Sequence, residues 1–425
     1  MTQVLDNVGR SAPRPTRSHP CRFCEAPLEH TVVDLGMSPP CESYLTTEQL
    51  NQMEPFYPLC VYVCEQCLLV QLQEYVDPRD IFREYAYFSS YSRSWVEHAR
   101  QYTELITERL RLGPESFVVE LASNDGYLLQ HFIEQGIRAL GIEPAQNVAA
   151  AAMAKNVPTL TEFFGIELAE QLVRDGRRAG LVIANNVLAQ VPDLNDFVAG
   201  IRMLLASDGV VTVEVPHLVR LFEGNQFDTI YHEHYSYFSL LSARRIFAAH
   251  NLVLFDVEEL STHGGSLRMY FRHEADLTKP IAPVVADLLA AEVRKGFDRL
   301  PRYLSFGPEV QRVKRRLLTF LIRAKEEGKQ VVGYGAPGKG NTLLNYCGIR
   351  TDLLEYTVDR NPYKQGRFLP GTHIPILEPS RITETRPDYV LILPWNLRDE
   401  ILQQLAYVRA WGARFVVPIP EVEVT

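Results

Sequence analysis

The chain has 425 residues, which is too long for one hydrophobic core and predicts two or three domains. Its formal net charge is −9 and no basic block stands out, which argues against nucleic acid or an anionic membrane as the main partner. No apolar run reaches the roughly 18 residues that span a bilayer, and no signal-peptide core opens the chain, so we expect a cytoplasmic protein.

The first segment, residues 1–18, is rich in proline, arginine, serine and threonine and has no periodic pattern. Such a composition is typical of a flexible tail.

Two Cys-x-x-Cys pairs follow, in a region that we expect to form a small domain over residues 19–76. Each pair offers two thiolates from one tight turn, and four thiolates complete a tetrahedral zinc site without an open position. The pattern therefore predicts structural zinc rather than catalytic zinc, with a set of buried free thiols as the alternative. The predicted ligands are Cys21, Cys24, Cys64 and Cys67.

Residues 81–91 are dense in aromatic and hydroxyl side chains and include Tyr85. This composition favours a lid that faces the substrate, although a helix that packs its aromatic residues inward explains it equally well. The apolar spacing over residues 94–112 then predicts a helix.

An apolar strand, a turn of small residues and a helix begin near residue 117, and a second short strand ends in an acid about twenty residues later. An acid there can accept both hydroxyls of a ribose, but the first turn lacks the glycines that cradle phosphates. A nucleoside without phosphates fits this pattern, and S-adenosylmethionine is the expected cofactor. The candidate cofactor-binding residues of the two strand ends are Glu120, Ala122, Asn124, Gly126, Tyr127, Glu143 and Pro144.

Strands predicted over 180–185 and 209–216 continue the alternation, which indicates a doubly wound α/β sheet. Asn185, Asn186 and Val187 at the exit of the first of these strands complete the cofactor candidates.

The stretch Tyr231–Phe238 follows the next strand and combines two imidazoles, a carboxylate and three phenols. Taken alone, it could be a polar surface loop. Because loops beyond the carboxyl ends of parallel strands line the ligand crevice, we expect an acid–base cluster instead. The paired glycines after His263 would let the backbone approach a ligand closely, with a tight turn into a strand as the alternative.

A second α/β unit begins near residue 329, after helices predicted over 285–297 and 310–325. Its glycine-rich turn with Lys339 predicts an anion site suited to a pyrophosphate. The turn is not a Walker A loop, because Gly340 follows the lysine.

Together these motifs resemble the S-adenosylmethionine-dependent sugar C-methyltransferases that make branched deoxysugars. The resemblance runs from the cysteine pairs through Glu120–Gly126, Asn185–Ala189, Tyr231–Tyr235 and His263–Arg268 to Gly333–Asn345. It implies a zinc domain (19–76), a methyltransferase domain (77–278) and a C-terminal Rossmann-like domain (279–425). It also implies a thymidine-diphosphate 4-keto-deoxysugar substrate methylated at C3, with a GDP-sugar as the alternative. We expect a monomer.

For the chemistry, we expect His234 to be the base, supported by Glu233, with Tyr231 and Tyr85 as donors to an enolate oxygen. The candidate substrate-binding residues are Tyr85, His263, Ser266, Gly335, Ala336, Lys339, Asn341 and Asp359.

One position near the expected reaction centre departs from the family, because Gln190 stands where members carry histidine. Glutamine can form hydrogen bonds but cannot shuttle a proton near neutral pH. Two other functions stay open: a nucleotide-sugar oxidoreductase or epimerase that binds NAD at the C-terminal glycine turn, and a non-catalytic nucleotide-sugar sensor.

Overall fold

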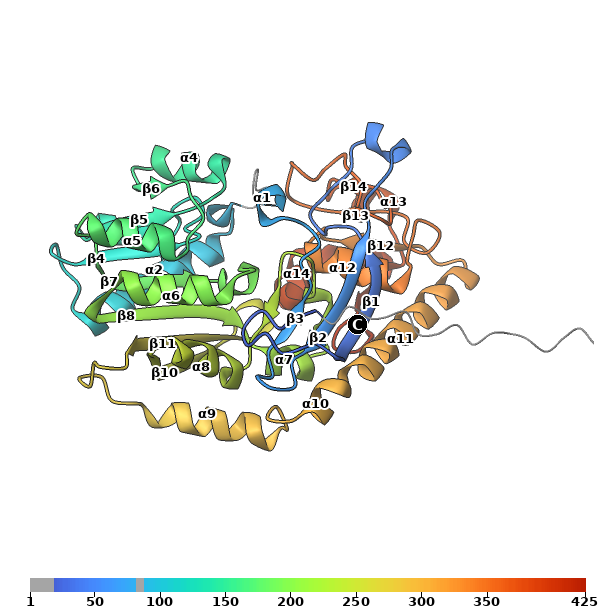
Figure 1. Ribbon diagram of the computed structural model, residues 1–425. Helices are drawn as coiled ribbons and strands as arrows, with labels where there is room; N and C mark the ends of the chain where they lie inside the picture. Colours follow the sequence, from blue (N-terminus) through green and yellow to red (C-terminus); the bar gives the residue numbers. More distant parts are fainter. Residues whose placement is uncertain (1–18, 82–87) are drawn as a thin grey trace, which may run out of the picture.

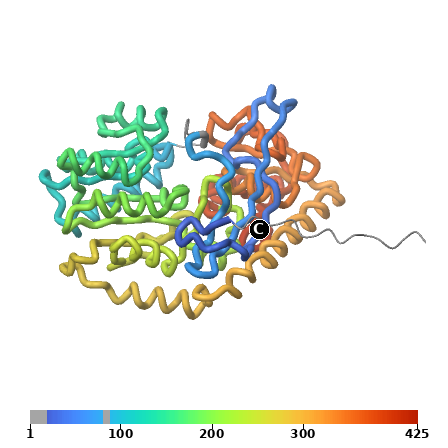
Figure 2. Tube along the Cα trace, in the orientation of Figure 1, coloured from blue at the N-terminus to red at the C-terminus, as the bar shows by residue number. Residues whose placement is uncertain are grey.

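The computed structural model of the chain describes residues 19–81 and 88–425, so the expected tail and Tyr85 lie outside the described residues. The described chain forms three sheets of four, seven and six strands (Figure 1). The N-terminal segment runs between the central and the C-terminal sheets, as the blue part of the trace shows (Figure 2). No helix among the described residues is long and apolar enough to cross a membrane.

The first sheet contains a strand from the middle of the chain. Strands β1, β2 and β3 form an antiparallel meander, and β9 pairs with β3 so that Gln71 lies opposite Ser236 and Val70 opposite Tyr237. The predicted acid–base stretch is therefore part of the N-terminal sheet. The bounds are β1 (His30–Ser38), β2 (Tyr57–Val63), β3 (Val70–Leu72) and β9 (Ser236–Tyr237), with the short helix α1 (Pro78–Ile81) after β3.

The central sheet has the order β10-β11-β8-β7-β4-β5-β6, which confirms the predicted α/β fold. Strands β4 to β8 are parallel, and β10 and β11 join antiparallel beyond β8. The strands are β4 (Phe117–Leu121), β5 (Arg138–Ile142), β6 (Thr159–Leu160), β7 (Ala179–Asn185), β8 (Leu205–Pro216), β10 (Leu252–Leu260) and β11 (Ser266–His273).

Helices cover both faces of this sheet because alternate strand residues point to opposite sides. In β4, Val119 and Leu121 pack with α5, α6 and α8, whereas Val118 packs with α2 and α3. The helices are α2 (Arg93–Leu110), α3 (Leu129–Glu134), α4 (Gln146–Ala154), α5 (Ile166–Arg174), α6 (Leu194–Leu204), α7 (Leu218–Glu223) and α8 (Leu240–Ala249). The strand order reverses at β4, so a ligand crevice is expected at its carboxyl end.

The C-terminal sheet has the order β14-β13-β12-β15-β16-β17 and is parallel except for β17. Its strands are β12 (Val331–Tyr334), β13 (Thr357–Val358), β14 (Ile376–Leu377), β15 (Tyr389–Ile392), β16 (Arg414–Val417) and β17 (Glu423–Val424). The helices of this part are α9 (Pro283–Arg294), α10 (Leu300–Leu304), α11 (Phe306–Glu326), α12 (Gly338–Cys347), α13 (Arg381–Thr385) and α14 (Arg398–Gln404).

One apolar core joins the N-terminal sheet to the C-terminal sheet. Val32 and Val61 of the first sheet, Phe306 and Val310 of α11, and Leu391 of β15 belong to the same buried cluster. Helices α9 to α11 run from the central sheet along one side of the molecule to this core (Figure 1). The N-terminal sheet is thus packed between the other two sheets.

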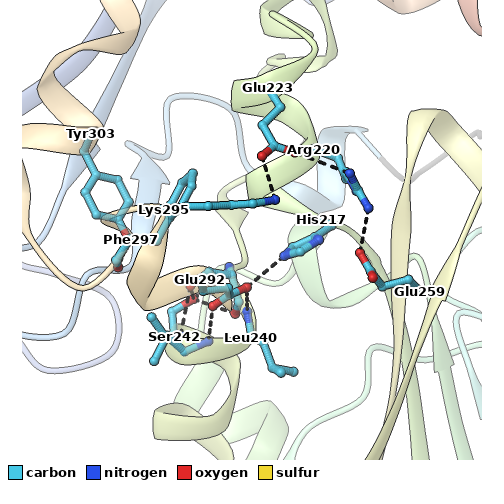
Figure 3. A network of polar contacts seen from close by, with 12 residues as sticks. His217, Arg220, Glu223, Leu240, Ser242, Glu259, Glu292, Lys295, Phe297 and Tyr303 are labelled. Carbon is cyan, nitrogen blue, oxygen red and sulfur yellow. Dashed lines mark hydrogen bonds and ion pairs between the residues drawn. The ribbon is translucent and has the colours of Figure 1, made fainter. Parts of the chain in front are cut away.

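A buried hydrogen bond links the end of β8 to helix α9 (Figure 3). The Nε2 atom of His217 lies 2.8 Å from the carboxylate of Glu292, and the two side chains are 2% and 1% exposed. The same carboxylate accepts hydrogen bonds from the backbone N–H groups of Leu240 and Leu241 at the start of α8. Since α8 begins soon after Phe238, Glu292 holds the end of the acid–base stretch in place.

We expect Glu292→Leu to lower the free energy of unfolding by about 3–5 kcal/mol, because three buried donors lose their acceptor. Glu223, which forms exposed pairs with Arg220 and Lys295 in the same view, is the matched control. Glu223→Leu should cost less than about 1 kcal/mol. Urea denaturation measures both, and equal losses would contradict a special role for the buried pair.

Candidate active site

A cavity of about 770 Å³ lies where the three sheets meet. Its wall contains most of the predicted site residues, which come from segments far apart in the sequence. The predicted residues that line it are Ala122, Asn124, Tyr127, Glu143, Pro144, Asn185, Asn186, Val187, Gln190, Tyr231, Glu233, His234, His263 and Lys339. The cavity is thus the site at which the expected cofactor, base and anion groups come together.

Seven described candidates do not line this cavity, and their role as ligands stays a prediction. They are Glu120, Gly126, Ser266, Gly335, Ala336, Asn341 and Asp359.

The cofactor side is shaped by the backbone at the ends of β4 and β5. The residues Ala122, Asn124 and Gly126 all have positive φ angles, of 54°, 51° and 74°. The carboxylate of Glu143 accepts hydrogen bonds from the backbone N–H groups of Asn124 and Ala145, each at 2.9 Å. Each of its oxygens keeps a lone pair that a ribose hydroxyl can use.

Gly126 and Glu120 are the two cofactor candidates that do not line the cavity, and packing and burial explain their positions. A Cβ at Gly126 would approach Val157 Cγ2 to 2.8 Å, so glycine is required there by packing. Glu120 is buried, and burial followed by the charge of Glu143 raises the pKa of its carboxyl well above the ordinary value. Both residues therefore lie behind the residues that form the wall of the cavity.

The end of β7 offers unused polar groups to a ligand. Among the described residues, the side-chain oxygen of Asn185 and the side-chain nitrogen of Asn186 are buried without a hydrogen-bond partner. Asn186 also has a positive φ of 56°. Buried polar groups are normally paired, so these two atoms are suited to a bound molecule.

The acid–base stretch places a neutral imidazole in the cavity. The rings of His234 and Tyr231 lie 4.3 Å apart, and the backbone N–H of His234 donates to the Tyr231 carbonyl at 3.0 Å. Burial, and secondly the charge of His263, lowers the pKa of His234 to about 4. The imidazole is therefore unprotonated near neutral pH and can accept a proton.

The carboxyl of Glu233 lies in the same cavity wall as His234. Burial, and secondly the charge of Glu42, raises the pKa of Glu233 to about 8, which favours the protonated carboxyl near pH 7. In the described part of the chain no hydrogen bond or ion pair joins its carboxyl to the imidazole of His234. The expectation that Glu233 supports His234, by orienting it or by raising its basicity, stays a prediction.

The structure also adds residues that the sequence pattern did not indicate. Tyr237 lines the cavity together with Cys41 and Glu42 of the N-terminal domain and Trp95 of α2. The Trp95 ring lies 4.9 Å from that of His263. No spacing rule could reveal Cys41 and Glu42, since they reach the cavity through long-range packing.

On the C-terminal side, Lys339 is the group that faces the cavity. Its ammonium donates to Asn396 Oδ1 at 2.8 Å and lies 4.8 Å from the centre of the Trp395 ring. Burial lowers its pKa, and the nearby charge of Asp228 acts in the opposite direction. Within the described residues no carboxylate lies within ion-pair distance of this half-buried ammonium, which is therefore suited to an anionic ligand.

The glycine-rich turn beside Lys339 is covered by the N-terminal domain. The Ala336 carbonyl accepts hydrogen bonds from the Tyr44 hydroxyl at 2.6 Å and from Lys364 Nζ at 2.9 Å. Ala336 N–H donates to Asp359 at 2.7 Å, and the Asn341 amide donates to the Cys41 carbonyl at 2.6 Å. These groups are used within the protein, so the part of the turn that faces the cavity is Pro337, Gly338 and Lys339.

Ser266 has a comparable structural role at the start of β11. Its buried hydroxyl donates to the Thr262 carbonyl at 3.0 Å and so closes the turn that presents His263 to the cavity.

The four predicted zinc ligands form one cluster. The sulfurs of Cys21, Cys24, Cys64 and Cys67 all lie within 4.8 Å of one another. Such a set fits tetrahedral zinc and leaves no position for a substrate. Zn²⁺ bound there would hold the two turns of the N-terminal domain together and would take no part in the reaction.

The comparisons with known proteins cover nearly the whole chain. Residues 21–82 match a family described as a zinc binding domain, residues 95–257 a methyltransferase domain, and residues 261–420 a C-methyltransferase C-terminal domain. The chain is 37% identical over 401 residues to the C-methyltransferase NovU of Streptomyces niveus, covering 94% of this chain and 95% of that protein.

Solved structures resemble a part of the chain only. The PH0226 protein of Pyrococcus horikoshii matches 47% of this chain and 99% of its own, with 12% identity and a TM-score of 0.37. The glycopeptide N-methyltransferase MtfA, solved with S-adenosylmethionine, matches 45% of this chain and 96% of its own, with 13% identity and a TM-score of 0.33.

The opposite pKa shifts of Glu233 and His234 predict how the stability of the ligand-free protein depends on pH. The folded pKa of Glu233, about 8, exceeds its ordinary 4.5, so the folded state binds more protons and stability falls as pH rises between these values. The folded pKa of His234, about 4, is below its ordinary 6.5, so its contribution to stability rises between these values and levels off above them. Of these two groups, Glu233 accounts for most of the change in stability above pH 6.5, because His234 in the unfolded state is then losing its last half proton.

We therefore expect Glu233→Gln to gain about 1–2 kcal/mol of stability over the wild type when the pH is raised from 6.5 to 8. Urea denaturation of the ligand-free proteins at the two pH values measures this difference. His234→Asn is the control and should show no such gain. A constant difference between Glu233→Gln and the wild type would contradict the raised pKa.

Proposed function

Because the chain belongs to the S-adenosylmethionine-dependent C-methyltransferases, we propose that it methylates a nucleoside-diphosphate 4-keto-deoxysugar at C3. The observation that carries the proposal is the shared cavity, which is lined by the cofactor-side residues, by the neutral imidazole of His234 and by Lys339. A thymidine-diphosphate sugar is the first candidate and a GDP-sugar the second.

In this proposal, S-adenosylmethionine supplies an activated methyl group when it is bound beside Asn124, Glu143 and the end of β7. Lys339, which lines the same cavity, binds the pyrophosphate of the sugar nucleotide. The ketone at C4 of the sugar then lies near the acid–base stretch and makes the proton on C3 acidic.

His234 accepts the C3 proton, and the electron pair of the broken C–H bond forms an enolate. Tyr231 donates a hydrogen bond to the enolate oxygen, and the protonated carboxyl of Glu233 is a second donor. S-adenosylmethionine held beside Asn124, Glu143 and the end of β7 would supply the methyl group to the enolate carbon, with S-adenosylhomocysteine as the leaving group. The proton on His234 returns to solvent.

This arrangement has a stereochemical consequence. If His234 removes the proton from one face of the sugar, the methyl group must arrive on the other face, and C3 is inverted. The two alternative functions find no support, since the family is a methyltransferase family and the first turn of the cofactor side lacks the glycines of a dinucleotide site.

We expect His234→Asn to lower kcat by about 10²–10⁴, the usual contribution of a general base, while S-adenosylhomocysteine still binds. Methyl transfer to TDP- and GDP-linked 4-keto-deoxysugars is followed by mass spectrometry, and calorimetry measures the binding. His131 on α3 lies outside the cavity, and His131→Asn is the matched control with unchanged turnover. Turnover near the wild-type rate in His234→Asn would exclude this residue as the base.

The substitution Gln190→His tests whether a second imidazole has a role near the reaction centre. We expect Gln190→His to leave kcat nearly unchanged, because a neutral imidazole in this cavity offers much the same hydrogen bonds as the amide. Measurement of kcat between pH 6 and 9 checks this. An increase of about tenfold or more would instead mean that this chain lacks a proton-transfer group that its chemistry can use.

A further inference from the structure

The first cysteine pair contacts the wall of the cavity through Arg22. This residue lies inside the turn Cys21–Cys24, and its guanidinium donates to the Pro192 carbonyl through Nη1 and to the Leu72 carbonyl through Nη2, both at 2.6 Å. Pro192 lines the cavity and lies two residues after Gln190, which also lines it. We call the turn Cys21–Cys24 the zinc turn. One of its side chains, that of Arg22, therefore holds both the end of β3 and the segment that carries Gln190.

A second contact reaches the same segment from this turn. The side-chain amide of Asn195 donates to the carbonyl of Phe23 at 2.9 Å. Together with Arg22, this bond attaches the turn of the first cysteine pair to both sides of Asp193, the N-cap residue of α6.

Arg22 also contacts the acid–base stretch. Its guanidinium lies 5.2 Å from the centre of the Tyr235 ring. The Tyr235 carbonyl accepts a hydrogen bond from the backbone N–H of Leu72, whose own carbonyl is bound by Arg22. Arg22 is thus in contact with both partners of the β3–β9 pairing.

Gln71 connects this arrangement to the metal ligands. Its side-chain amide donates to the sulfur of Cys21 at 3.1 Å, and its side-chain oxygen accepts from the backbone N–H of Arg22 at 2.9 Å. The same residue lies opposite Ser236 in the β3–β9 pairing and is 1% exposed. A zinc ligand, Arg22 and the acid–base stretch therefore share one buried residue.

The choice of arginine is informative because its guanidinium is partly buried against two carbonyls and a ring, with the charges of Glu74 and Asp193 nearby. Burial of a charge costs free energy, so a residue present only for stability would be better replaced by an apolar one. The planar guanidinium has donors in a rigid fork, which fixes two carbonyl oxygens at a set distance and angle. Lysine keeps the charge but cannot fix both carbonyl oxygens, because its ammonium lacks the planar fork of donors.

We propose that Arg22 is a positioning residue for methyl transfer. It holds the Gln190 segment and the Tyr231–Phe238 stretch in the geometry set by the zinc turn, so that bound zinc shapes the cavity as well as the N-terminal domain. Its effect on turnover rests on the proposed function, whereas its effect on the two segments does not.

Hydrogen exchange of Arg22→Lys tests the positioning, with the zinc content of the protein measured first. In the zinc-loaded variant, peptides covering 70–72, 188–192 and 231–238 should exchange at least about tenfold faster, the factor for one lost hydrogen bond to a charged group. Peptides of the C-terminal sheet should not change. Wild-type exchange in the three peptides would overturn the proposal, as would faster exchange throughout the protein.

Arg272→Lys is the matched control. Arg272 is also buried and also donates to backbone carbonyls, those of Lys279, His273 and Glu274, but it does not line the cavity. This variant should leave exchange in the three peptides and turnover unchanged. If the three peptides exchange faster in both Arg22→Lys and Arg272→Lys, Arg22 contributes only to general stability, and the proposal is overturned.

Kinetics and metal removal complete the test. Arg22→Lys should lower kcat by about tenfold or more and leave the Kd of S-adenosylhomocysteine within about twofold of the wild-type value. Wild-type protein treated with a zinc chelator should show faster exchange in the same three peptides, and slow exchange there would overturn the link to zinc. If the wild type methylates no 4-keto sugar, the proposed function fails while the exchange results still decide the role of Arg22.

Discussion

The pairing of β9 with β3 is the constraint on which the active site depends. Two residues of the central domain, Ser236 and Tyr237, complete the sheet of the zinc domain. Since side chains alternate across a strand, a shift of one residue in this pairing would turn every neighbouring side chain to the opposite face. A sheet of this size has little core of its own and is stabilised by its metal. The position of the acid–base stretch is therefore tied to the zinc site.

Burial acts in opposite directions on the two central groups of the cavity. It lowers the pKa of His234 and raises that of Glu233, so both are neutral before substrate binds. In the proposed reaction, proton transfer would create charge next to the donors Tyr231 and Glu233. A bound pyrophosphate near Lys339 would bring negative charge close to His263 and His234 and would favour the protonated imidazole. The substrate would thereby strengthen its own base.

The sequence predicts the parts of the site that depend on local patterns. The spacing of the cysteines identifies the zinc ligands, and the strand–turn–helix pattern identifies the α/β sheets and places Asn124, Glu143 and Asn186 at the strand ends where the cavity lies. Long-range packing decides the rest. Tyr44 and Cys41 cover the turn at Ala336, and only the folded chain brings them there.

Gln190 shows how the whole cavity determines what one residue can do. The cavity wall already contains His234, His263 and Lys339, and the pKa values of all three are lowered by burial. His263 and Lys339 further disfavour positive charge on their neighbours. Another imidazole there would compete with His234 for a proton or would stay neutral, whereas an amide supplies hydrogen bonds without either effect. Glutamine is therefore compatible with a single base at His234, provided that the segment which carries it is held in place from the zinc turn.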